Sequence, residues 1–189
     1  MSKVSSFPDR VWLGEGLIAA VSVGLFFILV GVIVVINLNI WSEVKHFLNS
    51  FTVANVGNSS IKLPVPISPA AYTAVYSVVF QFALGIAILE ILILAMRLSL
   101  GSRRERSAET VGHLVFWVGA VFLLNNLTDM KSTLALSQQQ SMWFQFWTAI
   151  IILFGFSLIA RGVFLLASAR WFVPKFLTFM FELGSRIFE

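Results

Sequence analysis

One carboxylate, Glu90, stands alone in an apolar stretch of this sequence. The 27 residues before it carry no Asp, Glu, Lys or Arg, and the next charged residue is Arg97, seven positions on. A charge inside such a stretch is costly and normally faces protein or water. Glu90 therefore either handles a proton or cation in transit, or is structural, as a buried ion pair with Arg161 or in its protonated form. We favour the structural role, because no second acid or histidine is expected at its level.

Neutral polar residues recur in the same apolar stretches. They predict either hydrogen bonds between helices or the lining of a polar path. The two histidines, His46 and His113, fall at opposite ends of the predicted fold, so one chain offers no His-based metal or haem site. Phosphate-binding, zinc-protease and serine-hydrolase motifs are absent, so we expect no catalytic activity and no cofactor. The neutral polar residues are Gln81, Gln145, Asn37 and Asn125.

The elements that position these residues follow from composition. The chain has 189 residues, 58% of them hydrophobic and 12% charged, with a mean hydropathy of +0.90. A membrane-spanning helix needs about 20 apolar residues, and four uncharged stretches are long enough. They predict an all-α membrane protein with transmembrane helices near 17–37, 70–97, 111–128 and 143–168. The first is too long for a signal-peptide core and lacks a clear cleavage site, which indicates a retained helix.

Lys and Arg set the expected orientation. Ten of the 13 flank the predicted spans at the two termini and after the second helix, and cytoplasmic flanks keep such an excess. We therefore expect an integral protein of the cell membrane, with its N- and C-termini cytoplasmic and anionic lipid headgroups as partners at the inner face. A single short arginine cluster gives no reason to expect nucleic acid. Zero cysteines exclude disulfides.

The predicted outer loop, residues 38–69, is too long for a simple connection. Its first part, residues 41–51, has apolar residues at helical spacing, which predicts a short helix on the membrane surface. Two extended runs, 51–56 and 59–63, predict a small β-hairpin, with the prolines that follow ending the second run. Asn58 heads a glycosylation acceptor pattern. Residues 171–189 predict an amphipathic helix that lies on the inner membrane surface or in a partner's groove.

The two halves of the chain resemble each other. Moving the first predicted helix by 88 positions aligns Gly24 with Gly112 and Asn37 with Asn125, and moving the second by 64 aligns the Phe-Gln-Phe triplets around Gln81 and Gln145. This indicates two tandem hairpin units, residues 1–107 and 108–170, related by an axis along the membrane normal, followed by the terminal segment 171–189.

Small residues repeat at matching positions of the first and third predicted helices. They fall on one stripe of each helix, where a neighbouring backbone can approach closely. The alternative is that glycine is simply frequent in membrane helices. The predicted packing residues are Ala20, Gly24 and Gly31, and their counterparts Ala108, Gly112 and Gly119.

Residues 112–168 resemble a segment of a known protein family. The sequence there resembles the two-helix membrane region shared by the LiaI and LiaF envelope-stress proteins, which implies a packed hairpin and carries no activity or site residue with it. The residues that carry it are Val121–Leu127, Trp143, Trp147, Ile150–Gly155 and Leu158–Arg161.

These observations predict a non-catalytic accessory or scaffold subunit, whose partners are the bilayer, other membrane subunits or further copies of the chain. The alternative is an oligomeric ion channel or small transporter in which Glu90, Gln81 and Gln145 face a shared path. An envelope-stress role follows only from the local resemblance.

Overall fold

The computed structural model describes residues 7–57 and 59–170, and the side chains of residues 14–57 and 59–168. Within this part of the chain there are four long helices, each long and apolar enough to cross a membrane, which confirms the prediction of four helices of that length and composition. Asn58 and the helix predicted over 171–189 lie outside the described residues. The four helices are α1 (Phe7–Ile36), α3 (Thr73–Ser99), α4 (Arg104–Thr128) and α5 (Leu136–Arg170).

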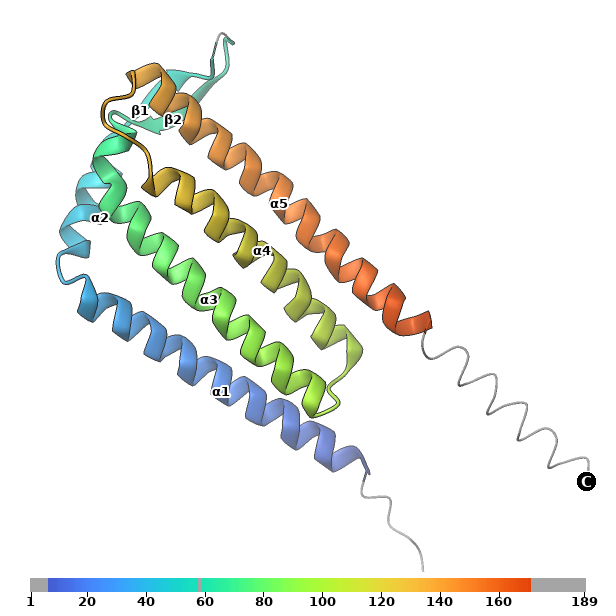
Figure 1. The fold of residues 1–189 in the computed structure, drawn as a ribbon. Coiled ribbons are helices and arrows are strands. Elements are labelled where there is room, and N and C mark those ends of the chain that lie inside the picture. Colours follow the sequence, from blue (N-terminus) through green and yellow to red (C-terminus); the bar gives the residue numbers. More distant parts are fainter. Residues whose placement is uncertain (1–6, 58, 171–189) are drawn as a thin grey trace, which may run out of the picture.

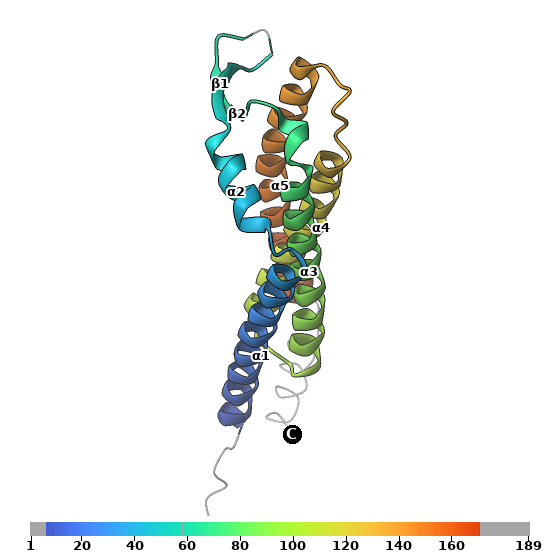
Figure 2. The ribbon, with the colours of Figure 1, turned by 90° about the vertical axis from the view of Figure 1, so that its left-hand side faces the viewer.

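The four helices form a single layer. α3 packs between α1 and α4, and α5 packs on the other side of α4, so the order across the layer follows the chain (Figures 1 and 2). The start of α1, the turn over residues 100–103 and the end of α5 lie at one end, which we call the terminal end. The opposite end carries the two strands, and we call it the hairpin end.

A tight turn joins α3 to α4. Gly101 has φ +64°, a left-handed conformation that glycine adopts without strain. The amide of Ser102 then donates to the carbonyl of Arg97 at 2.9 Å, which closes the last turn of α3. With only residues 100–103 between them, the two helices run antiparallel, and positions equally far from the turn lie side by side.

A short helix and a β-hairpin are both present at the hairpin end, as predicted. Helix α2 (Ile40–Asn49) leads into β1 (Phe51–Asn55), which pairs antiparallel with β2 (Lys62–Pro66), and η1 (Pro69–Tyr72) then enters α3. The prediction that the prolines end the second strand before residue 64 is wrong. Pro64 lies opposite Val53 within the ladder, because each strand of a two-stranded sheet has a free edge where no N–H is required.

Aromatic side chains hold this region against the helices. Trp143 of α5 is 5% exposed and its Nε1 donates to the carbonyl of Pro64 in β2 at 3.3 Å. Around it lie Phe47 of α2, Phe51 of β1 and Tyr76 of α3, with ring centroids 6.0–6.1 Å from Trp143. The hairpin is therefore anchored to α3 and α5, since an isolated two-stranded hairpin is marginal in water.

Candidate functional site

The polar groups of the layer form three levels that start at the terminal end. At the first level, Arg97 in the last turn of α3 reaches across to α4. Its Nη1 donates to Thr110 Oγ1 at 2.6 Å and to the carbonyl oxygen of Arg106. Thr110 is buried and donates to the same carbonyl at 3.1 Å. This level connects the start of α4 to the end of α3.

At the second level, one carboxylate lies between two arginines. Glu109 of α4 is 3.3 Å from Arg161 Nη2 of α5 and 3.7 Å from Arg106 Nη1 of its own helix. α5 comes close here because Gly112 has no side chain, and a Cβ built on it would lie 3.1 Å from the carbonyl oxygen of Ser157. The pairing ties α4 to α5 and uses the arginine that the sequence suggested for Glu90.

At the third level, Glu90 of α3 meets His113 of α4, with Oε1 and Nδ1 3.3 Å apart. The Glu90 side chain is 14% exposed, whereas that of His113 is 66% exposed. Each residue is nine positions from its helix end at the 100–103 turn, which places both about 14 Å along the helices at 1.5 Å per residue.

The expected pairing of Glu90 with Arg161 is therefore replaced by a pairing with His113, and the expectation that no histidine lies at this level is wrong. Because α4 separates α3 from α5, Arg161 meets Glu109 instead. The signal that could have found His113 is the shared distance from the turn. In the described residues, no group of three or more His, Asp or Glu side chains comes together as metal ligands do.

Beyond this level the contact between α3 and α4 is apolar. Toward the hairpin end, these two helices carry buried alanine and leucine side chains, each at most 6% exposed: Ala83 and Ala87 of α3, and Ala120 and Leu124 of α4. Gln81 lies on the α1 side of α3, where its Oε1 accepts from Asn37 Nδ2 at 3.2 Å, and Gln145 is exposed on α5. Glu90, Gln81 and Gln145 are thus not brought together within one chain.

The two copies of the small-residue stripe lie in different surroundings. In α4, Ala108 and Gly112 are buried, and Gly119 faces the side chain of Leu153 in α5. In α1, Ala20, Gly24 and Gly31 are exposed, and a Cβ built on either glycine would meet no atom within 4 Å. The second copy packs inside the layer, whereas the first has no neighbour in the described part of the chain.

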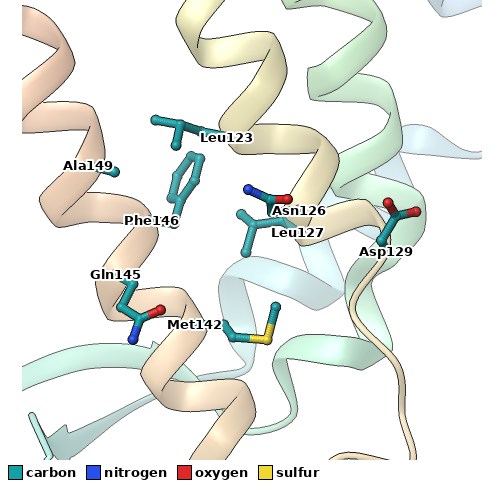
Figure 3. Close-up of a pocket in the computed structure, with 8 residues that line it drawn as sticks. All are labelled: Leu123, Asn126, Leu127, Asp129, Met142, Gln145, Phe146 and Ala149. Carbon is teal, nitrogen blue, oxygen red and sulfur yellow. The ribbon is translucent and has the colours of Figure 1, made fainter.

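A pocket of about 450 Å³ lies between α4 and α5 at the hairpin end (Figure 3). Asn126 of α4 and Phe146 of α5 face each other across it, with Gln145 farther along α5 and Asp129 on the side of α4. The sequence predicted only Gln145 of this set as a candidate site residue, because the pocket depends on how two helices diverge. Its lining comprises Leu123, Asn126, Leu127, Asp129, Met142, Gln145, Phe146 and Ala149.

The residues that bear on function thus form two sites, the three polar levels at the terminal end and the pocket at the hairpin end. The resemblance of residues 112–168 to the LiaI and LiaF membrane region stays a prediction. Comparison of the chain with protein-family models, with curated proteins and with solved structures gives no match.

Proposed function

We propose that the protein is a non-catalytic subunit of a larger membrane assembly, which holds a partner through the face of the layer that exposes His113. The single observation that carries this proposal is the 66% exposure of the His113 side chain about 14 Å from the end of its helix. The first turns of α4, residues 104–110, are polar, so His113 lies about one turn inside the apolar part of the helix. An ionisable side chain there normally faces protein or water, because exposure to hydrocarbon is costly. A partner helix laid over His113 would remove that cost.

The arrangement of the layer supports a partner rather than a pore within the chain. A single layer cannot bury both of its faces, so the imidazole of His113 remains at its surface, whereas the Glu90 side chain is 14% exposed. Toward the hairpin end, the described parts of α3 and α4 bury alanine and leucine side chains beyond the pair, which argues against a polar path between these two helices. The channel alternative then requires a path formed between several copies, with Glu90 facing it.

Photo-crosslinking tests the proposal without removing His113. Benzoylphenylalanine is placed at Phe116, three residues from His113 on the same side of α4, or at Phe122, nine residues from His113 and therefore on the opposite side. In native membranes we expect a discrete protein adduct from position 116 and lipid adducts from position 122. Lipid adducts alone from both positions would contradict the proposal.

Ion flux separates the two functions. The purified protein in liposomes is expected to give the same flux as its Glu90→Gln variant, because the scaffold role moves no ion. A homo-oligomer whose flux changes on this substitution would replace the scaffold by the channel.

We also propose the finer architecture: two tandem hairpin units in the cell membrane, with the terminal end cytoplasmic and residues 171–189 forming an amphipathic helix on the inner surface. The orientation is supported by the clustering of Arg97, Arg103, Arg104 and Arg106 at the terminal end, as cytoplasmic flanks are enriched in such residues.

A further inference from the structure

The pocket between α4 and α5 has the make-up of a ligand site. Its volume of about 450 Å³ falls within the range of roughly 300–1,000 Å³ that small-molecule sites occupy. One part of the lining is apolar, with Leu123, Phe146 and Ala149 among its residues, and the other part carries the amides of Asn126 and Gln145 and the carboxylate of Asp129. An amphiphilic ligand matches this division.

The charge of the lining restricts the head of that ligand. Among the described residues, no Lys or Arg lines the pocket, whereas Asp129 contributes a carboxylate, of which one oxygen, Oδ2, accepts from Asn125 Nδ2 at 3.1 Å. A lipid whose headgroup carries only negative charge would face an acid with no cation in the lining. A group that donates hydrogen bonds and carries positive charge suits the carboxylate and the two amides, because charge-assisted hydrogen bonds are the strong ones.

The order of the lining residues along α4 favours a lipid over a soluble ligand. Asp129 directly follows the last residue of α4, whereas Leu123 lies six residues back along the helix, about 9 Å deeper at 1.5 Å per residue. A lipid in the membrane places its headgroup and chain in that same order. We propose that this pocket binds a membrane lipid by its primary ammonium headgroup, such as phosphatidylethanolamine, with an acyl chain along Leu123, Phe146 and Ala149.

Lipid retention tests this site independently of any protein partner. The full chain is reconstituted in nanodiscs with equal amounts of phosphatidylethanolamine, phosphatidylcholine and phosphatidylglycerol with the same acyl chains, and retained lipid is counted by native mass spectrometry. The first two lipids differ only in the methylation of the ammonium group, so their ratio isolates its N–H donors. We expect the ethanolamine lipid to be retained over the choline lipid by about tenfold, the ratio that one charge-assisted hydrogen bond supplies.

Three variants show whether the preference arises in this pocket. Asp129→Asn keeps an acceptor for Asn125 and is expected to bring the ratio of ethanolamine to choline lipid close to one. Ala149→Trp fills the apolar part and should reduce retention of both lipids. Glu43→Gln removes a carboxylate from α2, outside this lining, and should leave the ratio unchanged.

Equal retention of the ethanolamine and choline lipids by the unaltered protein would overturn the proposal, and so would preferential retention of the glycerol lipid. A preference that survives both Asp129→Asn and Ala149→Trp would also overturn it, because the lipid would then bind elsewhere. The crosslinking experiment at α4 tests the scaffold role, and lipid retention tests the pocket. Failure of one proposal is therefore distinguishable from failure of the other.

Discussion

Replacing Gly112 by alanine should destabilise the contact between α4 and α5, whereas the same replacement of Gly24 in α1 should not. A Cβ on Gly112 would lie 3.1 Å from the carbonyl oxygen of Ser157 and 3.4 Å from the Cβ of Arg161. The first of these belongs to the backbone of α5, so the contact can be relieved only by moving that helix. A Cβ on Gly24 would meet nothing within 4 Å.

The comparison isolates packing because both variants gain the same intrinsic helix preference, roughly 0.5–1 kcal/mol for Gly to Ala. Overpacking of a close contact typically costs about 1–3 kcal/mol. We therefore expect the free energy of unfolding of Gly112→Ala to lie about 1–3 kcal/mol below that of Gly24→Ala. Gly31→Ala should behave like Gly24→Ala, since its added Cβ also meets open space.

Unfolding of the purified chain in mixed micelles, followed by circular dichroism as the denaturing detergent is increased, measures this difference. Purified protein is required, because a partner that covers α1 in native membranes would make Gly24 a contact as well. Equal unfolding free energies for Gly112→Ala and Gly24→Ala would refute the close approach of α5 to α4. A lower value for Gly24→Ala alone would show that α1 is packed and α5 is not.

Two further predictions concern topology and the anchor of the hairpin. Because the chain has no cysteine, Ser59→Cys and Ser102→Cys each provide a unique thiol, and an impermeant maleimide should label them from opposite sides of the membrane. Labelling of both from one side would contradict the membrane crossing of α3. Trp143→Phe removes the donor to Pro64. Amide hydrogen exchange across β1 and β2 should then become faster, by the rate ratio that corresponds to a loss of about 1 kcal/mol of local stability, whereas exchange in α3 should not change. Unchanged exchange in both strands would place the anchor elsewhere.

The sequence predicted the four spans because the length of an apolar stretch is directly readable, but it placed the starts of α4 and α5 seven residues too late. The early turns of these helices, residues 104–110 and 136–142, are polar enough to fall outside an apolar window. A helix does not end where the hydrocarbon ends, since its backbone hydrogen bonds continue into water. The start of α4 at Arg104 is also what brings His113 to the level of Glu90.

The pairing of Glu90 was missed because lateral order cannot be read from spans. Equal depth made Arg161 a reasonable partner, yet α4 lies between the two helices and supplies Glu109 to Arg161. The pocket was missed for a related reason. Its lining residues come from two helices whose separation changes along their length, from the close contact at Gly112 to the opening beside Asn126.

Exposed apolar surface does not reveal where a membrane protein binds its partners, because lipid tails are as apolar as leucine. α1 and α5 each have a spanning window that is only 6% buried, and such faces are equally satisfied by lipid or by protein. An exposed imidazole is different, because lipid offers it no hydrogen-bonding partner. The imidazole of His113 also sets the depth of the partner helix in the membrane. A helix that contacts only apolar residues can slide along the layer, whereas a helix that hydrogen-bonds His113 is held at a single level. On this reasoning, the Glu90–His113 pair would determine the register of the partner as well as its position, and conversion of His113 to leucine should weaken both.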